Sequence, residues 1–78
     1  MTLADLSTGD SCVVLNIKHG TNLRKRLIDL GFIPGTIVGV KKIAPLGDPI
    51  EVTIRSYELA LRRTEAEMIQ IKKKLKAR

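Results

Sequence analysis

The chain has 78 residues, 44% of them apolar, which suits one small globular domain and argues against disorder. Of its 14 basic residues five lie in 72–78, which holds no acid, so the formal charge of +6 belongs mainly to this tail. One cysteine excludes an internal disulfide, and no apolar run approaches the roughly 20 residues that span a bilayer. With no signal-peptide pattern at its start, the chain is expected to be cytoplasmic.

The first residues predict a short helical turn. Thr2 and Asp5 have the spacing of a capping box with a shorter acid, which would place Leu3 and Leu6 over the sheet. A turn is expected at 8–10, because threonine, glycine and aspartate follow one another there.

Residues 11–17 predict the first strand. Val13, Leu15 and Ile17 alternate at a period of two and should share one face. Cys12 alternates with Val13, so we interpret it as a small residue of the core or of a sheet face.

A short helix is predicted over residues 23–30. Thr21 or Asn22 would cap its beginning, and Gly31 stands where a left-handed residue ends a helix. One apolar stripe would pack on the sheet, formed by Leu23, Leu27 and Leu30.

The remaining sequence predicts strands separated by turns. Pro34 and Gly35 suit a type II turn, and residues 36–43 form a β-branched strand in which Gly39 indicates a bend or a close backbone approach. Later elements are expected as a loop over 44–49, strands over 50–55 and 59–62 with a turn over 56–58, a helical turn over 64–67, and a last strand at 69–71. The fold class is therefore mostly β: a small, strongly bent five-stranded barrel with one short helix between strands 1 and 2. A single domain is expected over 1–71, followed by the basic tail 72–78.

The residue types offer little material for catalysis. Cys12 and His19 are the single cysteine and histidine, and no third group is spaced to orient them as a nucleophile pair. Two such residues cannot close a structural zinc site, which needs four ligands. The acids are scattered, and His19, beside a glycine, is interpreted as solvated. We expect no enzyme activity, no cofactor and no metal ligands.

Three cations stand at the start of the predicted helix. Arg24, Lys25 and Arg26 oppose the helix dipole by roughly 0.3–1 kcal/mol each, a cost that sometimes marks an anion-binding surface. An acidic face of a protein is the favoured anion, because the spacing of a nucleotide P-loop is absent. The alternative is that these cations pair with nearby acids, such as Lys25 with Asp29.

Nucleic-acid binding stays open as an alternative. Small barrels bind RNA, and the tail 72–78 would add a salt-sensitive attraction. Single-strand binding normally needs stacking aromatic side chains, however, and this chain offers Phe32 and Tyr57 alone.

Several blocks together resemble one family. The run RLIDLGFIPGT at 26–36, followed by APLGDPI at 44–50, LALR at 59–62 and EA at 65–66, closely resembles the FeoA family. The resemblance implies an SH3-like barrel and a small cytosolic accessory protein of ferrous iron uptake. The implied partner is FeoB, a membrane transporter with a cytoplasmic GTP-binding domain. The family offers no iron-ligand motif that transfers to this chain.

The resemblance also directs attention to two surfaces. We expect partner contacts from the exposed helix face and from the tip of the 44–49 loop, that is from Arg24, Lys25, Ile28, Asp29, Leu46, Gly47 and Asp48. The tail is not part of the shared pattern, and its contact with an anionic membrane stays open, as does a homo-oligomer. Because the same barrel occurs in iron-dependent repressors, a metal-responsive domain is a further alternative; a complete repressor is not expected without a winged helix.

Overall fold

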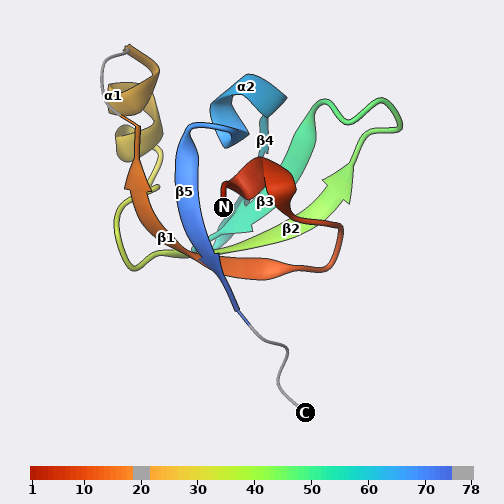
Figure 1. Ribbon diagram of the computed structural model, residues 1–78, viewed down its shortest axis with the longest axis horizontal. Helices are drawn as coiled ribbons and strands as arrows, with labels where there is room; N and C mark the ends of the chain where they lie inside the picture. Colours follow the sequence, from red (N-terminus) through yellow and green to blue (C-terminus); the bar gives the residue numbers. More distant parts are fainter. Residues whose placement is uncertain (19–21, 75–78) are drawn as a thin grey trace.

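The computed structural model describes residues 1–18 and 22–74, and Figure 1 shows the arrangement of the chain. The predicted loop at His19, the candidate cap Thr21 and the end of the basic tail, 75–78, lie outside the described residues. The elements in chain order are η1 (Leu3–Asp5), β1 (Ser11–Ile17), α1 (Asn22–Asp29), β2 (Ile37–Ile43), β3 (Ile50–Ile54), β4 (Tyr57–Leu61), α2 (Arg63–Ala66) and β5 (Ile69–Lys73). The last strand thus extends two residues into the lysine run.

The five strands form one antiparallel sheet in the order β4-β3-β2-β1-β5. We expected a barrel that closes and so removes its edges, but within the described residues no ladder joins β4 to β5. Other segments cover these edges instead. Thr2 bridges to Gln70 beside β5, and the Tyr57 hydroxyl at the start of β4 donates to the carbonyl oxygen of Leu30, just after α1. Covering an edge limits pairing with other chains as closure would.

The strand β1 differs from the predicted alternation. Cys12 and Val14 are buried, whereas Leu15 is 49% exposed and Ile17 is buried again. The register against β5 shifts between Val14 and Asn16, which marks a β-bulge. An extra residue in a strand reverses the alternation beyond it, so the prediction that Val13, Leu15 and Ile17 share one face was wrong.

The segment around α1 confirms the predicted roles of Gly31 and Gly35, but Asn22 is not the cap that the sequence predicted. The helix begins at Asn22, so that residue lies within it. Gly31 follows with φ of +111°, and its N–H donates to the carbonyl oxygen of Ile28. Gly35 has φ of +93°, and the N–H of Thr36 closes the turn on the Ile33 carbonyl oxygen at 3.0 Å. Glycine serves both positions because side chains disfavour positive φ.

Two later boundaries differ from the prediction. The turn expected at 56–58 lies at Arg55 and Ser56, with Arg55 at φ of +55°, so β4 begins at Tyr57. The α2 helix begins at Arg63 rather than at Thr64, because the Glu65 carboxylate accepts the Arg62 N–H at 2.9 Å and caps the turn one position earlier.

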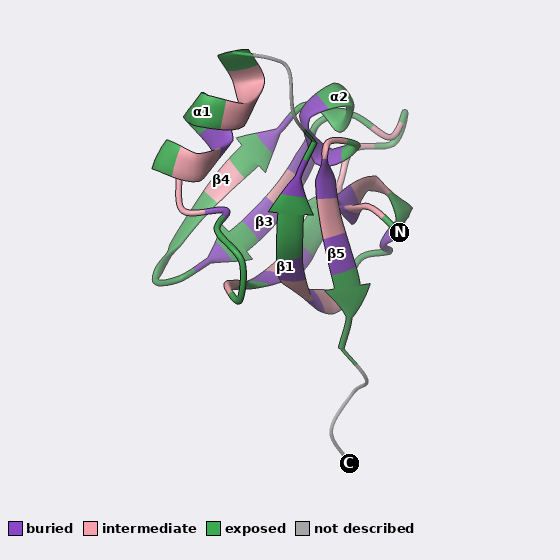
Figure 2. Ribbon diagram, turned by 60° about the vertical axis from the view of Figure 1, so that its left-hand side comes forward, coloured by how far each residue is buried: buried purple, intermediate pink, exposed green. Residues whose placement is uncertain are grey.

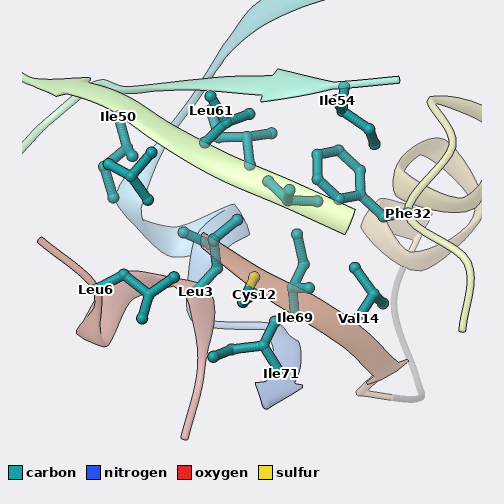
Figure 3. Close-up of a cluster of buried hydrophobic side chains, with 14 of the residues drawn as sticks. Leu3, Leu6, Cys12, Val14, Phe32, Ile50, Ile54, Leu61, Ile69 and Ile71 are labelled. Carbon is teal, nitrogen blue, oxygen red and sulfur yellow. The ribbon is translucent and has the colours of Figure 1, made fainter. Parts of the chain in front are cut away.

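The core is aliphatic and continuous (Figure 3). Phe32 is fully buried in it, and η1 covers one side of the sheet with Leu3 and Leu6. Cys12 is 0% exposed, as predicted. Figure 2 shows buried residues alternating with less buried ones along the strands. The remaining core residues are Val14, Ile17, Leu27, Val38, Val40, Ile50, Val52, Ile54, Leu61, Ala66, Ile69 and Ile71.

Candidate interaction surfaces

The helix α1 is fixed to the sheet by Leu27, which is fully buried, so its opposite face is available to a partner. Lys25 and Asp29 lie exposed on that face, as predicted. Ile28 is half-buried and packs against the core, and the Arg24 Nε donates to the Ile17 carbonyl oxygen at 3.4 Å. Two of the four predicted contact residues on the helix are therefore exposed, and the other two fix it in place.

The three cations of α1 are divided between different partners. Arg26 forms an ion pair with Glu65, whose side chain is only 5% exposed, and Arg24 is held by Ile17. In the described part of the chain no ion pair joins Lys25 to Asp29. The cations therefore do not form one shared anion site, and Lys25 keeps its charge toward solvent.

The loop at 44–49 presents one large apolar side chain. Leu46 is 95% exposed at its tip, and the turn is closed by the Gly47 N–H, which donates to the Ala44 carbonyl oxygen at 2.7 Å. Asp48 accepts the backbone N–H of Arg63 at 3.0 Å, so its carboxylate ties the loop to the first turn of α2. Asp48 thus positions the loop, and Leu46 is the side chain that protrudes from its tip.

The predicted helix face and the loop do not form one patch. Figure 1 and Figure 2 both place them apart with α2 between them, all along one side of the molecule. We call residues 22–29, 44–49 and 62–67 the helix-side rim. Sequence reasoning missed the contribution of α2, which adds exposed Arg62 and an Arg63–Glu67 ion pair of 3.7 Å to this rim. The two consecutive arginines after an apolar strand were the available signal.

The single cysteine lies in the interior of the protein. Burial raises the pKa of the Cys12 thiol to about 11, which keeps it protonated and unreactive at neutral pH. Among residues 1–18 and 22–74, no three His, Cys, Asp or Glu side chains gather as a group that could hold a metal ion. No helix in the same residues is long and apolar enough to cross a bilayer.

A five-stranded antiparallel sheet around a filled aliphatic core, with short helices along one rim, defines a small, mostly β protein. The FeoA domain family model matches residues 1–73, and the chain belongs to this family.

Similar proteins agree with this assignment. A Porphyromonas gingivalis Fe(2+) transport protein A/FeoB fusion protein is 37% identical over 71 residues, which are 91% of this chain and 8% of that protein. The solution structure of the FeoA protein from Chlorobium tepidum has a TM-score of 0.82 at 42% identity, over 91% of this chain and 68% of that one. Stenotrophomonas maltophilia FeoA, described as a prokaryotic SH3 domain protein complexed with zinc, has a TM-score of 0.83 at 32% identity, over 92% and 89% of the two chains. The expected SH3-like fold is confirmed.

Proposed function

We propose that this chain is a cytoplasmic accessory protein that binds the cytoplasmic GTP-binding part of a FeoB-type transporter and catalyses no reaction itself. The observation that carries the proposal is the Porphyromonas gingivalis relative, in which a segment similar to this chain is fused to FeoB. Fusion holds two parts at a high effective concentration, so the same pair on separate chains needs a surface with affinity of its own.

The helix-side rim is the surface that we propose for this contact. Leu46 would be its apolar anchor, since burying a leucine side chain contributes about 1.5–3 kcal/mol. Lys25 and Asp29 would supply charges at the edge of the contact, which mainly govern association rate and salt dependence. The proposed roles of Arg24, Ile28, Gly47 and Asp48 are to hold the helix and the loop in place.

Calorimetric titration against the soluble cytoplasmic part of the transporter from the same organism tests this proposal. Leu46→Ala should weaken binding by about tenfold or more, which is the effect of losing at least 1.4 kcal/mol. Lys25→Glu should weaken binding most at low salt. Leu15→Ala is the matched control, because Leu15 is an exposed leucine on β1 outside the rim. Absence of binding by the unmodified chain at roughly 100 μM would contradict the proposal.

A further inference from the structure

A second surface lies on the outer face of β1, β2 and β3, on the side of the sheet away from the core. A shallow hollow of ≈ 650 Å³ lies over the row Ser11, Gly39 and Thr53, with Ile37 and Arg55 among its lining residues. The register confirms that the row is continuous, because Ser11 pairs with Gly39 and Gly39 pairs with Thr53. Residues directly opposite one another on neighbouring strands share a face. We call this hollow the outer-face groove.

The floor of the groove consists of a glycine that the fold itself does not require. Gly9, Gly31, Gly35 and Gly47 all have positive φ, but Gly39 does not. A Cβ at Gly39 would meet nothing closer than the Asp10 carbonyl oxygen at 4.0 Å. Glycine inside a strand lowers stability by roughly 0.5–1 kcal/mol relative to alanine. Such a glycine often marks a place where another backbone approaches closely.

Arg55 at the side of the groove carries a second local cost. Its φ of +55° is in the left-handed region, which is unfavourable for a residue with a side chain by roughly 1–2 kcal/mol. Backbone strain of this kind is concentrated at functional sites in folded proteins. The φ of Arg55 belongs to the two-residue turn between β3 and β4, and this turn fixes the Arg55 backbone at the side of the groove.

The charges and shape of the groove indicate what it would bind. The Arg55 side chain is exposed and makes no hydrogen bond or ion pair within residues 1–18 and 22–74, and the same holds for the Lys72 side chain. Lys72 pairs with Val13, which pairs with Ile37, so this cation lies on the same face. On this face Glu58 is already neutralised by Lys41 at 2.8 Å. The groove therefore presents hydroxyl groups, an aliphatic side chain and the Arg55 cation, and Lys72 adds a second cation on the same face outside its lining.

We infer that the outer-face groove binds an extended acidic segment of the partner protein, with its main chain over Gly39 and a carboxylate near Arg55 and Lys72. This inference rests on the proposed function and adds a second contact to it. A segment that lies across a sheet face needs no aromatic pocket. In the part of the chain that the structure describes, no aromatic side chain lines this groove. A basic tail from a second copy is disfavoured, because Arg55 and Lys72 would repel it.

Filling the groove tests the inference without damaging the fold. Gly39→Val adds a β-branched side chain that suits a strand, so its thermal midpoint should equal or exceed that of the unmodified chain. Its affinity for the transporter's cytoplasmic part should nevertheless fall about tenfold. Asn16→Val is the matched control, because it places the same side chain at an exposed strand residue outside both the groove and the helix-side rim. It should bind as the unmodified chain does.

A charge variant tests the acidic character of the bound segment separately from the shape of the groove. Asparagine tolerates the left-handed region, so Arg55→Asn should stay folded, bind several-fold more weakly and depend less on salt. Salt dependence unchanged by Arg55→Asn would overturn the acidic assignment. Equal binding by Gly39→Val and the unmodified chain would overturn the groove and leave the proposed function standing. Absence of binding by the unmodified chain would contradict both the groove and the proposed function.

Discussion

Replacing Arg26 by alanine would leave the Glu65 carboxylate, which is almost fully buried, without its side-chain donor. The two residues are 39 positions apart, and their ion pair joins α1 to α2 across the helix-side rim. The second carboxylate oxygen still accepts the Arg62 N–H at 2.9 Å, so the capping of α2 is retained. The variant therefore isolates the link between the two helices.

The structure sets the size of the expected effect. A hydrogen bond to a charged group contributes about 1.5–3 kcal/mol to stability. Because the Arg26 side chain is 57% exposed, solvent screens the pair, and we discount the loss to about 1–2 kcal/mol. In a domain of this size each kcal/mol shifts the thermal midpoint by about 4–8 °C, so Arg26→Ala should unfold about 5–15 °C lower.

Circular dichroism is the appropriate assay, since the chain contains no tryptophan for fluorescence. The urea midpoint should fall with an unchanged slope, which would show that the folded state is weakened and not expanded. Lys41→Ala is the control, because the Lys41–Glu58 pair has both side chains about half exposed and its loss should not be measurable. An Arg26→Ala effect no larger than that of Lys41→Ala would refute the reasoning.

Four further predictions concern the interior and its turns. The buried Cys12 thiol, with its pKa raised to about 11, should react with an alkylating reagent at pH 8 about 100-fold more slowly than in urea. The pKa of this thiol in the folded protein is above its ordinary value of 9.0. The folded protein should therefore lose stability as the pH rises from 9 to 11, and urea midpoints measured across that range would detect the loss. Phe32→Ala should cost about 3–5 kcal/mol in urea unfolding, since the ring is fully buried. Gly31→Ala should lower the thermal midpoint, because its φ is +111° and a Cβ would lie 3.2 Å from Arg55 Nε, whereas Gly39→Ala should not. An equal effect of the two glycine substitutions would contradict the account.

The fold was predictable where local chemistry decides it. Alternating aliphatic residues gave β2 and β3, and Gly31 and Gly35 gave their turns, because positive φ selects glycine directly. The bulge after Val14 was not predictable, since it depends on how β1 meets β5 across the sheet. The left-handed Arg55 likewise has no residue-type signal, because turn rules favour glycine or asparagine there.

The candidate site was predictable only in part, for the same reason. Exposure of Lys25, Asp29 and Leu46 followed from helix periodicity and from a loop rich in proline and glycine. The ion pair of Arg26 with Glu65 and the hydrogen bond from the Arg63 N–H to Asp48 join segments that are distant in the sequence. Spacing rules within one helix could not find them, so the helix cations were wrongly grouped.

The central claim is that the protein functions through its outer surface, which binds the cytoplasmic part of a transporter. Nitrogen-15 amide spectra of the labelled chain, recorded while that part is added, test it most directly. We predict that signals of the helix-side rim around Lys25 and Leu46, and those of the groove around Gly39, shift together, while the signal of buried Leu6 stays unchanged. Spectra that do not change at a several-fold excess of the partner, or that change mainly in the core, would contradict the claim.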